Sequence, residues 1–310
     1  MKKISYMLRS ASFRVLEVVR SLFSGWRLRE IPLIASVYNF LFSRLKPEFI
    51  DFEGSKIYLD PLDVLLLYRN KGHESFITEI FKEKIKEGDA VLDLGAHIGY
   101  YTMLAAKLVG PQGKVFAFEP DPTNFSLLRK SAVANCYDNI TLEQRGVADT
   151  EGVAKLFLYS STENSIAPEL YRGFEHIPFV EISLVGLDEY FKNANLKVSF
   201  IKMDVEGAEG LALQGMKQVI SQNPHLTLIT EFAPAALRKV SRMEPLEYAQ
   251  ALLDAGFKIY EIQAEARVLV PLFERNGLSL VLNHKMVEAL VEKLTPETGC
   301  FGTNFLCLRD

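Results

Sequence analysis

The sequence predicts an α/β fold, a Rossmann-like and mostly parallel sheet with helices on both faces. Three observations indicate this. Compact apolar runs of strand length recur along the chain, stretches with helical periodicity separate them, and glycine-containing turns join the two kinds of segment. Strands that alternate with helices in this way are typical of a parallel sheet. The 310 residues, 48% apolar and 24% charged, are enough for one large domain or two small ones, and they exclude wholesale disorder.

The first elements of the core follow from local signals. Residues 74–86 are expected to form a helix, which Gly88 ends. Residues 90–94, A-V-L-D-L, are a compact buried strand, and a helix over residues 100–109 follows the glycine turn after it. The sequence G-P-Q-G at residues 110–113 is a turn that leads into the next strand.

The rest of the core continues this alternation. Gly256 closes a helix in front of one of the later strands. The expected elements are a short early strand at 56–59, strands at 115–118, 140–143, 198–203, 226–230, 257–262 and 305–308, and helices at 124–135 and 211–220. No repeat or low-complexity segment interrupts them, so we expect one domain over residues 50–310, preceded by an extension over residues 1–49.

Residues 153–185 depart from this pattern. Two alternating runs, 154–159 and 179–184, flank the polar stretch S-S-T-E-N-S at 160–165. We expect a loop or hairpin that stands over one edge of the sheet. Ligands of an open parallel sheet lie beyond the carboxyl ends of its strands, where such an insertion can cover them.

The clearest chemical motif is V-L-D-L-G-A-H-I-G-Y-Y-T, residues 91–102. Asp93 lies near the end of a strand, and Gly95 and Gly99 allow the chain to turn tightly into a helix close to a ligand. Glu119 lies 26 positions after Asp93, at the end of the next strand, where a carboxylate can accept hydrogen bonds from both hydroxyls of a ribose. Together these features predict a ligand that contains a nucleoside.

The spacing of the glycines distinguishes between nucleoside ligands. A dinucleotide fingerprint, G-x-G-x-x-G, needs glycines where this chain has His97 and Tyr100. Their side chains would crowd a pyrophosphate, but they leave room for a ribose that carries a thioether chain. S-adenosylmethionine therefore fits better than NAD, and the alternative is a glycine turn that binds no ligand.

A second constellation, I-K-M-D-V-E-G-A-E at residues 201–209, ends a buried strand with an acidic turn. Asp204, Glu206 and Glu209 lie where the next helix begins, so they are either helix-capping carboxylates or a functional cluster at the ligand edge of the sheet. Three acids within six residues exceed what capping requires, which favours function. Glu231, at the end of another strand, adds an acid at the same edge.

The net charge of −4, from 35 basic and 39 acidic residues, disfavours a general nucleic-acid binder. The charge is uneven, because residues 1–46 carry nine basic and two acidic side chains, a local net charge of +7. The apolar residues of this segment share one helical stripe, which predicts an amphipathic helix. One interpretation is an interfacial helix that binds anionic lipid or a lipid-like substrate. The alternative is a helix that docks on the protein's own surface or on a second subunit.

Neither a membrane-spanning helix nor a secretory signal is expected. The longest apolar run, residues 31–42, is interrupted by proline and polar residues and is shorter than the roughly 20 residues that span a bilayer. Three scattered cysteines, Cys136, Cys300 and Cys307, suit a reducing compartment rather than a disulfide framework or a zinc site. The expected location is cytoplasmic, with association to the inner face of the membrane left open.

Four segments carry a resemblance to a known family: the glycine motif at 91–102, F-E-P at 118–120, K-M-D-V-E-G-A-E at 202–209 and T-E-F at 230–232. They resemble the FkbM family of S-adenosylmethionine-dependent methyltransferases. The resemblance covers about residues 90–262 and is specific, because the D-x-E-G-x-E block is far less common than the glycine motif. It implies the class I methyltransferase fold, a seven-stranded sheet whose last strand runs antiparallel.

The resemblance also implies where ligands bind. In this family Glu119 would hold the ribose hydroxyls, and Gly146 and Val147 would lie near the adenine. The family methylates hydroxyl groups of sugars or other secondary metabolites, so the expected acceptor is a small molecule or a glycolipid. The implied cofactor contacts are Asp93, Gly95, Ala96, His97, Gly99, Glu119, Gly146, Val147 and Asp204.

Methyl transfer to a hydroxyl requires in-line alignment and removal of the hydroxyl proton. Asp204 is the first candidate for the base, because it lies nearest the expected methyl position, and Glu206, Glu231 and His97 follow as alternatives or orienting groups. Asp204, Glu206 and Glu231 are also candidates to hold a divalent cation that lowers the pKa of the acceptor, although clusters of oxygen ligands alone are unselective evidence for a metal.

Two rival classes stay open at this point. A nucleotide-dependent dehydrogenase would share the sheet and the ribose-binding acid, but the missing middle glycine argues against it. A non-catalytic, membrane-associated binding protein would keep the fold and act through residues 1–46. No nucleophile motif of a hydrolase is visible in the sequence.

Overall fold

The structure, a computed structural model, divides the chain into two compact units, Met1–His73 and Glu74–Asp310. The amphipathic helix predicted within residues 1–46 lies almost entirely outside the residues that the structure describes. The described residues are 37, 40–41, 44–61, 65, 67, 74–159, 164–167, 176–194, 196–276, 279–295 and 302–309. Among them, no helix combines the length and apolar character needed to cross a membrane.

The first unit contains an antiparallel hairpin of β1 (Phe49–Phe52) and β2 (Ser55–Tyr58). Glu53 and Gly54 join the strands with φ angles of 52° and 82°, the left-handed backbone that two-residue hairpin turns require. The amide of Gly54 donates to Oδ1 of Asp51 at 3.1 Å, which fixes the turn. The short strand predicted at residues 56–59 is confirmed as the second arm of this hairpin.

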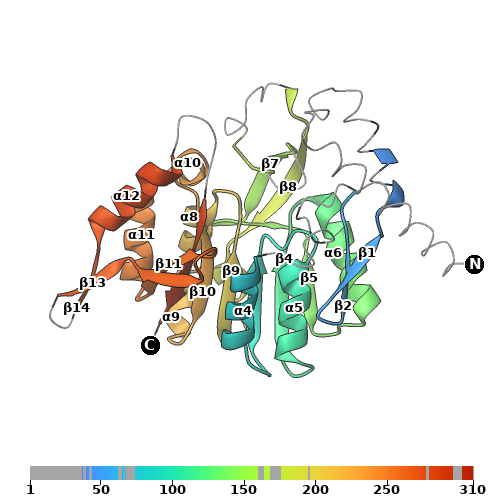
Figure 1. Cartoon of the computed structure of the whole chain (residues 1–310), viewed down its shortest axis with the longest axis horizontal. Coiled ribbons are helices and arrows are strands. Elements are labelled where there is room, and N and C mark those ends of the chain that lie inside the picture. The colour runs from blue at the N-terminus through green and yellow to red at the C-terminus, as the bar shows by residue number, and fades with distance from the viewer. Residues whose placement is uncertain are drawn as a thin grey trace, which may run out of the picture. The chain divides into compact units, whose positions relative to one another are not determined.

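The second unit is built on a mostly parallel sheet of eight strands (Figure 1). In spatial order the strands are β12 (Val268–Pro271), β11 (Lys258–Gln263), β15 (Thr303–Leu308), β10 (Thr227–Phe232), β9 (Val198–Met203), β3 (Ala90–Leu94), β4 (Lys114–Phe118) and β5 (Ile140–Glu143). Five strands, β5, β4, β3, β9 and β10, run parallel to one another, and β15 runs antiparallel to both β10 and β11.

The parallel sheet and the antiparallel last strand predicted from the sequence are thus confirmed, but the strand number of seven is wrong. The eighth strand, β12, arises because a turn at Ala264–Arg267 folds the chain back against β11. Arg267 N donates to Ala264 O at 3.3 Å in this turn, and Arg267 has a φ of 55°. The added strand lies at the edge of the sheet, far along the strand order from β3 and β4.

Helices connect the strands. The helix expected over residues 211–220 is in fact two helices that separate at Gly215, because Asp188 takes the backbone hydrogen bonds there. The amide of Asp188 donates to Gly215 O at 2.7 Å, and the carboxylate of Asp188 accepts from the amides of Gln218 and Val219. The helices are α4 (Ser75–Lys84), α5 (Tyr100–Val109), α6 (Pro122–Asn135), α7 (Leu187–Tyr190), α8 (Glu209–Gln214), α9 (Lys217–Gln222), α10 (Pro234–Ala236), the π-helix η5 (Leu237–Ser241), α11 (Pro245–Asp254) and α12 (His284–Leu294).

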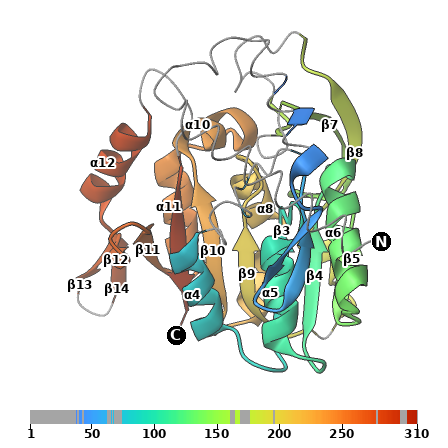
Figure 2. The ribbon, with the colours of Figure 1, turned by 45° about the vertical axis from the view of Figure 1, so that its right-hand side comes forward.

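The helices cover both faces of the sheet. On one face, Phe81 of α4 stacks on Tyr101 of α5 and contacts Phe200 of β9, with ring centroids 4.7 and 4.6 Å apart, and Figures 1 and 2 show α4 and α5 on the near side of the sheet. On the other face, α8, α9, α11 and α12 bury one apolar core against alternate strand residues such as Leu92 and Ile201. Burial of this kind dominates folding stability.

This alternation decides where the polar strand residues point. Successive side chains of a strand face opposite sides of the sheet. Since Leu92 and Leu94 belong to the core beneath α8 and α11, Asp93 faces α5, and its carboxylate indeed accepts from Thr102 of that helix. By the same rule Lys202 lies on the side of α4 and α5, like Phe200 two residues before it.

The expected insertion is a hairpin. β7 (Gly152–Phe157) and β8 (Phe179–Val185) pair antiparallel, and β8 also pairs with β6 (Gly146–Val147) to make a separate three-stranded sheet, whose hairpin rises above the main sheet in Figure 1. A second hairpin, β13 (Phe273–Asn276) with β14 (Ser279–Leu282), follows the edge strand β12.

Candidate functional site

The glycine turn after β3 is built around close backbone contacts. Gly95 has a φ of 80°, and a Cβ atom there would lie 1.8 Å from the carbonyl oxygen of Asp204, so that only glycine fits. The amide of Asp204 donates to Leu94 O at 3.0 Å. The turn therefore brings the first motif of the sequence directly against the second.

Glu119 lies beside this turn, as its position after β4 predicted. Its side chain is 6% exposed, and its two oxygens accept from the backbone amides of His97 at 2.7 Å and of Asp121 at 2.8 Å. Burial raises the pKa of Glu119 to about 8, and the two amide hydrogen bonds oppose that rise. Each carboxylate oxygen has capacity for a further hydrogen bond, which suits the hydroxyls of a ribose.

His97 takes part in this arrangement through its backbone. The hydrogen bond from His97 to Glu119 is donated by the backbone amide of His97. This is possible because His97 has a φ of 51°, which turns its N–H toward β4. The contact therefore depends on the backbone conformation of the turn, for which the residue type at position 97 is only one determinant.

A row of polar side chains crosses four neighbouring strands on the face toward α4 and α5, at the carboxyl ends of β3, β9 and β10 and at the amino end of the antiparallel β15. Asp93 is paired with Lys202 across β3 and β9, and Glu231 is paired with Asn304 across β10 and β15. We call Asp93, Lys202, Glu231 and Asn304 the polar row. No role was assigned to Lys202 from the sequence, although a lysine within an apolar strand is itself an unusual signal.

Lys202 is the central charge of the polar row. It is 6% exposed, its Nζ donates to Oδ2 of Asp204 at 2.8 Å, and Nζ lies 5.2 Å from the ring centroid of Tyr101. Burial alone would lower the pKa of Lys202, but the carboxylates of Asp204 and Asp93 outweigh burial and raise it. The ammonium group is therefore a fixed positive charge.

The carboxylates around Lys202 outnumber it. Asp93 is 2% exposed, its Oδ2 accepts from Thr102 Oγ1 at 2.5 Å, and its Oδ1 has no hydrogen-bond partner among the described residues. Burial raises the pKa of Asp93, which Lys202 and Thr102 oppose. Burial, reinforced by Asp204, raises the pKa of Glu231 well above its ordinary value. An acceptor-rich, acidic environment of this kind suits a ligand that carries positive charge.

The start of α4 closes over the polar row. Glu74, the residue that precedes α4, accepts from Tyr101 OH at 2.7 Å and from Asn304 Nδ2 at 3.3 Å. It has a φ of 43°, a strained conformation for a non-glycine residue that is typical of functional sites. Tyr101 was not predicted to contribute, because its hydroxyl meets Glu74 only in the folded structure.

The acidic turn after β9 separates into exposed and buried carboxylates. Glu209 is fully buried, and its Oε1 accepts from the amide of Val205 at 2.9 Å, so it braces the turn in front of α8. Burial raises its pKa to about 7. The Asp204 side chain is 37% exposed and is therefore the accessible acid beside Gly95. Glu206 takes a φ of 55° and Gly207 a φ of 94°, which makes the bend.

Gly146 and Val147 form β6, and a Cβ on Gly146 would lie 3.9 Å from Pro120, the neighbour of Glu119. The cation cluster considered for Asp204, Glu206 and Glu231 is not found, because the described part of the chain contains no group of three or more His, Cys, Asp or Glu side chains placed to hold a metal ion.

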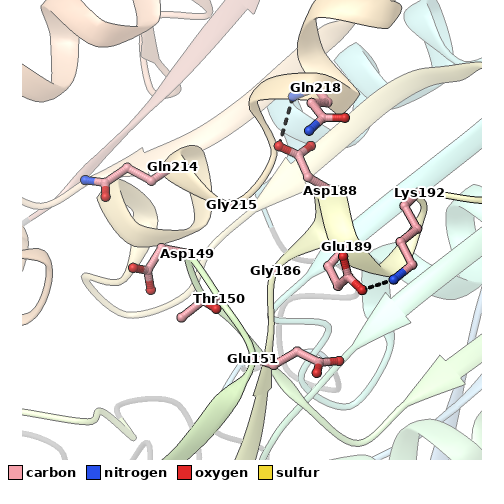
Figure 3. Close-up of a pocket in the computed structure, with 10 residues that line it drawn as sticks. All are labelled: Asp149, Thr150, Glu151, Gly186, Asp188, Glu189, Lys192, Gln214, Gly215 and Gln218. Atoms are coloured by element: carbon pink, nitrogen blue, oxygen red, sulfur yellow. Dashed lines mark hydrogen bonds and ion pairs between the residues drawn. The ribbon is translucent and has the colours of Figure 1, made fainter.

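A surface pocket of about 460 Å³ lies elsewhere, and none of the predicted site residues lines it (Figure 3). Two of its four acidic residues have partners: Asp188 accepts from the amides of Gln218 and Val219, and Glu189 forms an ion pair with Lys192. The site predicted from the sequence is thus distinct from this pocket.

Comparison with known proteins identifies a family whose sequence match includes these strand ends. Residues 93–259, more than half of the chain, match the family described as the methyltransferase FkbM domain. The chain belongs to this family. The matched region contains the glycine turn, Glu119 and the acidic turn, and in the FkbM family the expected cofactor is S-adenosylmethionine.

Curated relatives match parts of this chain. It is 34% identical over 108 residues to the 31-O-demethyl-FK506 methyltransferase FkbM of Streptomyces tacrolimicus, covering 32% of this chain and 41% of the relative. It is 26% identical over 204 residues to the methyltransferase sdnD of Sordaria araneosa, covering 56% of this chain and 76% of the relative. A solved O-methyltransferase of Thermotoga maritima has 14% identity and a TM-score of 0.39, covering 89% of this chain and 82% of that one.

Proposed function

We propose that this protein is an S-adenosylmethionine-dependent methyltransferase that O-methylates a hydroxyl group of a sugar, glycolipid or other small molecule. The observation that carries the proposal is the meeting of two acidic residues at one glycine turn, Glu119 through its carboxylate and Asp204 through its backbone. Glu119 is buried and hydrogen-bonded by amides of the turn region, whereas Asp204 contacts Gly95 and is accessible. Membership of the FkbM family supports methyl transfer over the rival dehydrogenase chemistry.

The cofactor supplies an electrophilic methyl group on a sulfonium. On the protein side, Glu119 binds the ribose, the backbone of the turn from Gly95 through Ala96 to Gly99 approaches the ligand closely, and Gly146 with Val147 borders the base. The acidic residues around Lys202 support binding of a positively charged sulfonium and amino group, and they include Asp93, whose Oδ1 has no hydrogen-bond partner within the described part of the chain.

Asp204 is the proposed base for the acceptor hydroxyl. Lys202 holds its Oδ2 at 2.8 Å and thereby fixes the orientation of the carboxylate, which is the main requirement for a transfer governed by alignment. Glu231 is a weaker candidate, because its raised pKa favours the protonated form, in which it would orient the acceptor as a donor. Glu206 and the His97 side chain are assigned supporting roles.

At pH 9, above the raised pKa of Glu119, we expect Glu119→Ala to weaken binding of S-adenosylhomocysteine by about 100-fold or more, because two hydrogen bonds to a charged group contribute about 1.5–3 kcal/mol each. Titration calorimetry on the purified protein would measure the loss. Glu189→Ala is the matched control, since Glu189 is paired with Lys192 outside the site. Because Glu119→Ala also leaves two amides without an acceptor, Glu119→Gln, which keeps one oxygen, serves as the second variant. Unchanged affinity in both variants would contradict the assignment.

The acceptor class is tested by transfer of an isotope-labelled methyl group. The full chain is incubated with labelled S-adenosylmethionine and an extract separated into small-molecule, lipid, glycan, protein and RNA fractions. We expect label in the small-molecule, lipid or glycan fraction, in an ether linkage that resists mild base. Label confined to protein or RNA would overturn the proposed acceptor, and absence of label from every fraction would overturn the proposed activity.

A further inference from the structure

Residues 164–167 of the insertion connect the two sides of the site. Asn164 Nδ2 donates to Oδ2 of Asp121 at 3.0 Å, on the side of Glu119. Ser165 Oγ donates to the carbonyl oxygen of Glu206 at 3.2 Å, on the side of the acidic turn. One short segment therefore contacts both motifs that the glycine turn brings together.

Specific contacts hold this segment in place. Ser165 is 2% exposed and exchanges two backbone hydrogen bonds with Phe157 of β7, at 2.9 and 3.3 Å. Ala167 packs with Ala208 and Val240 in a small apolar cluster beside the acidic turn. The position of Asn164, next to Ser165 in the chain, is therefore fixed from both the hairpin and the acidic turn.

The partner of Asn164 determines which way its amide points. Asp121 caps α6, with Oδ1 accepting from the amides of Thr123 at 2.7 Å and Asn124 at 2.8 Å. A carboxylate that caps a helix can only accept, so the NH₂ group of Asn164 must face it. The amide oxygen of Asn164 then points elsewhere, and it is buried without a hydrogen-bond partner among the described residues. A buried carbonyl left without a donor is destabilising, and a ligand that brings a donor would remove this penalty.

The hydrogen-bond network indicates which ligand brings that donor. The amide of Asp121 donates to Oε1 of Glu119, the proposed ribose-binding oxygen, so Asn164 is linked to Glu119 through a single residue. We infer that Asn164 is a cofactor-binding residue whose side-chain oxygen accepts a hydrogen bond from the nucleoside of the cofactor, either from a ribose hydroxyl or from the amino group of the base. This inference rests on the proposed function.

The test uses two ligands and measures binding alone. Adenosine contains only the nucleoside, and S-adenosylhomocysteine contains the amino-acid chain as well. We expect Asn164→Ala to bind both about three- to tenfold more weakly than wild type, which corresponds to one neutral hydrogen bond. We expect Asn164→Asp to lose more, because its carboxylate would face that of Asp121. The control is Asn276→Ala in the exposed end of β13.

The ligand-free melting temperature distinguishes a binding role from a structural one. The inference expects Asn164→Ala to melt within a degree or two of wild type without ligand, and to show a smaller shift than wild type when S-adenosylhomocysteine is added. The inference is overturned if Asn164→Ala binds adenosine as wild type does while Glu119→Ala does not. It is also overturned if Asn164→Ala lowers the melting temperature, relative to wild type, by as much without ligand as with S-adenosylhomocysteine. Wild-type protein that binds neither ligand would instead refute the proposed function.

Discussion

Lys202→Met is expected to destabilise the folded protein by about 3–5 kcal/mol, the loss typical of removing one partner from a buried ion pair. Methionine fills the space of the aliphatic stem, so the change removes mainly the charge. Asp93, which is 2% exposed, would then keep a buried carboxylate with no nearby cation of the polar row. Denaturant unfolding at pH 7.5 would measure the loss.

The deficit should depend on pH, and its sign follows from Asp93. Burial already raises the pKa of Asp93 above the ordinary value of 3.8, and loss of Lys202 would raise it further. An acid with a raised pKa in the folded state binds more protons there than in the unfolded chain, so stability increases as the pH falls. The difference between Lys202→Met and wild type should therefore be greatest near pH 8 and shrink toward pH 5.

Lys192→Met provides the matched control for this series. Lys192 pairs with Glu189 at the surface, and both side chains are 54% exposed. Exposed pairs contribute little, so the control should unfold close to wild type at every pH. A Lys202→Met deficit that stays constant from pH 5 to 8 would show that lost packing, and not lost charge, accounts for the effect.

Asp204→Asn is expected to lower the rate of methyl transfer by about 10²–10⁴-fold, the usual contribution of a positioned general base. The amide keeps the size of the side chain and an oxygen that Lys202 can contact, but it cannot take a proton. Since the backbone of Asp204, rather than its side chain, contacts Gly95, cofactor binding should change much less than the rate.

Single-turnover transfer and calorimetric binding of S-adenosylhomocysteine separate these two effects. Asp254→Asn, an exposed aspartate that pairs with Gln250 at the end of α11, is the control. If Asp204→Asn lowers the transfer rate by no more than the factor by which it lowers the affinity for S-adenosylhomocysteine, Asp204 binds the cofactor and is not the base. In that case Glu206→Gln and Glu231→Gln become the next variants to measure.

The local parts of the site could be predicted from the sequence. Gly95 and Gly99 indicate a turn because few other residues adopt left-handed backbone, and they have φ values of 80° and 93°. Glu119 could be placed beside them, because the carboxyl ends of adjacent parallel strands share one edge. The antiparallel final strand came from the family resemblance, and the pairing of β15 with β10 confirms it.

The polar row could not be predicted in the same way. Asp93 meets Lys202 because β3 and β9, far apart in the sequence, are neighbours in the sheet, and this depends on the order of the strands. The separation of α8 from α9 likewise depends on Asp188, a residue of another helix, which takes the hydrogen bonds that a continuous helix would use. Such contacts are tertiary, and local propensity carries no signal for them.

Asp121 determines which hydrogen-bonding group the side chain of Asn164 presents on its other side. Because a carboxylate offers only lone pairs, Asn164 turns its NH₂ group toward Asp121 and leaves its carbonyl to the other side. Asparagine at position 121 would still cap α6, but its own amide could turn a donor toward Asn164. The Asn164 amide would then reverse and present N–H groups instead of a carbonyl. A single substitution outside direct ligand contact would thus invert the hydrogen-bonding polarity of the site.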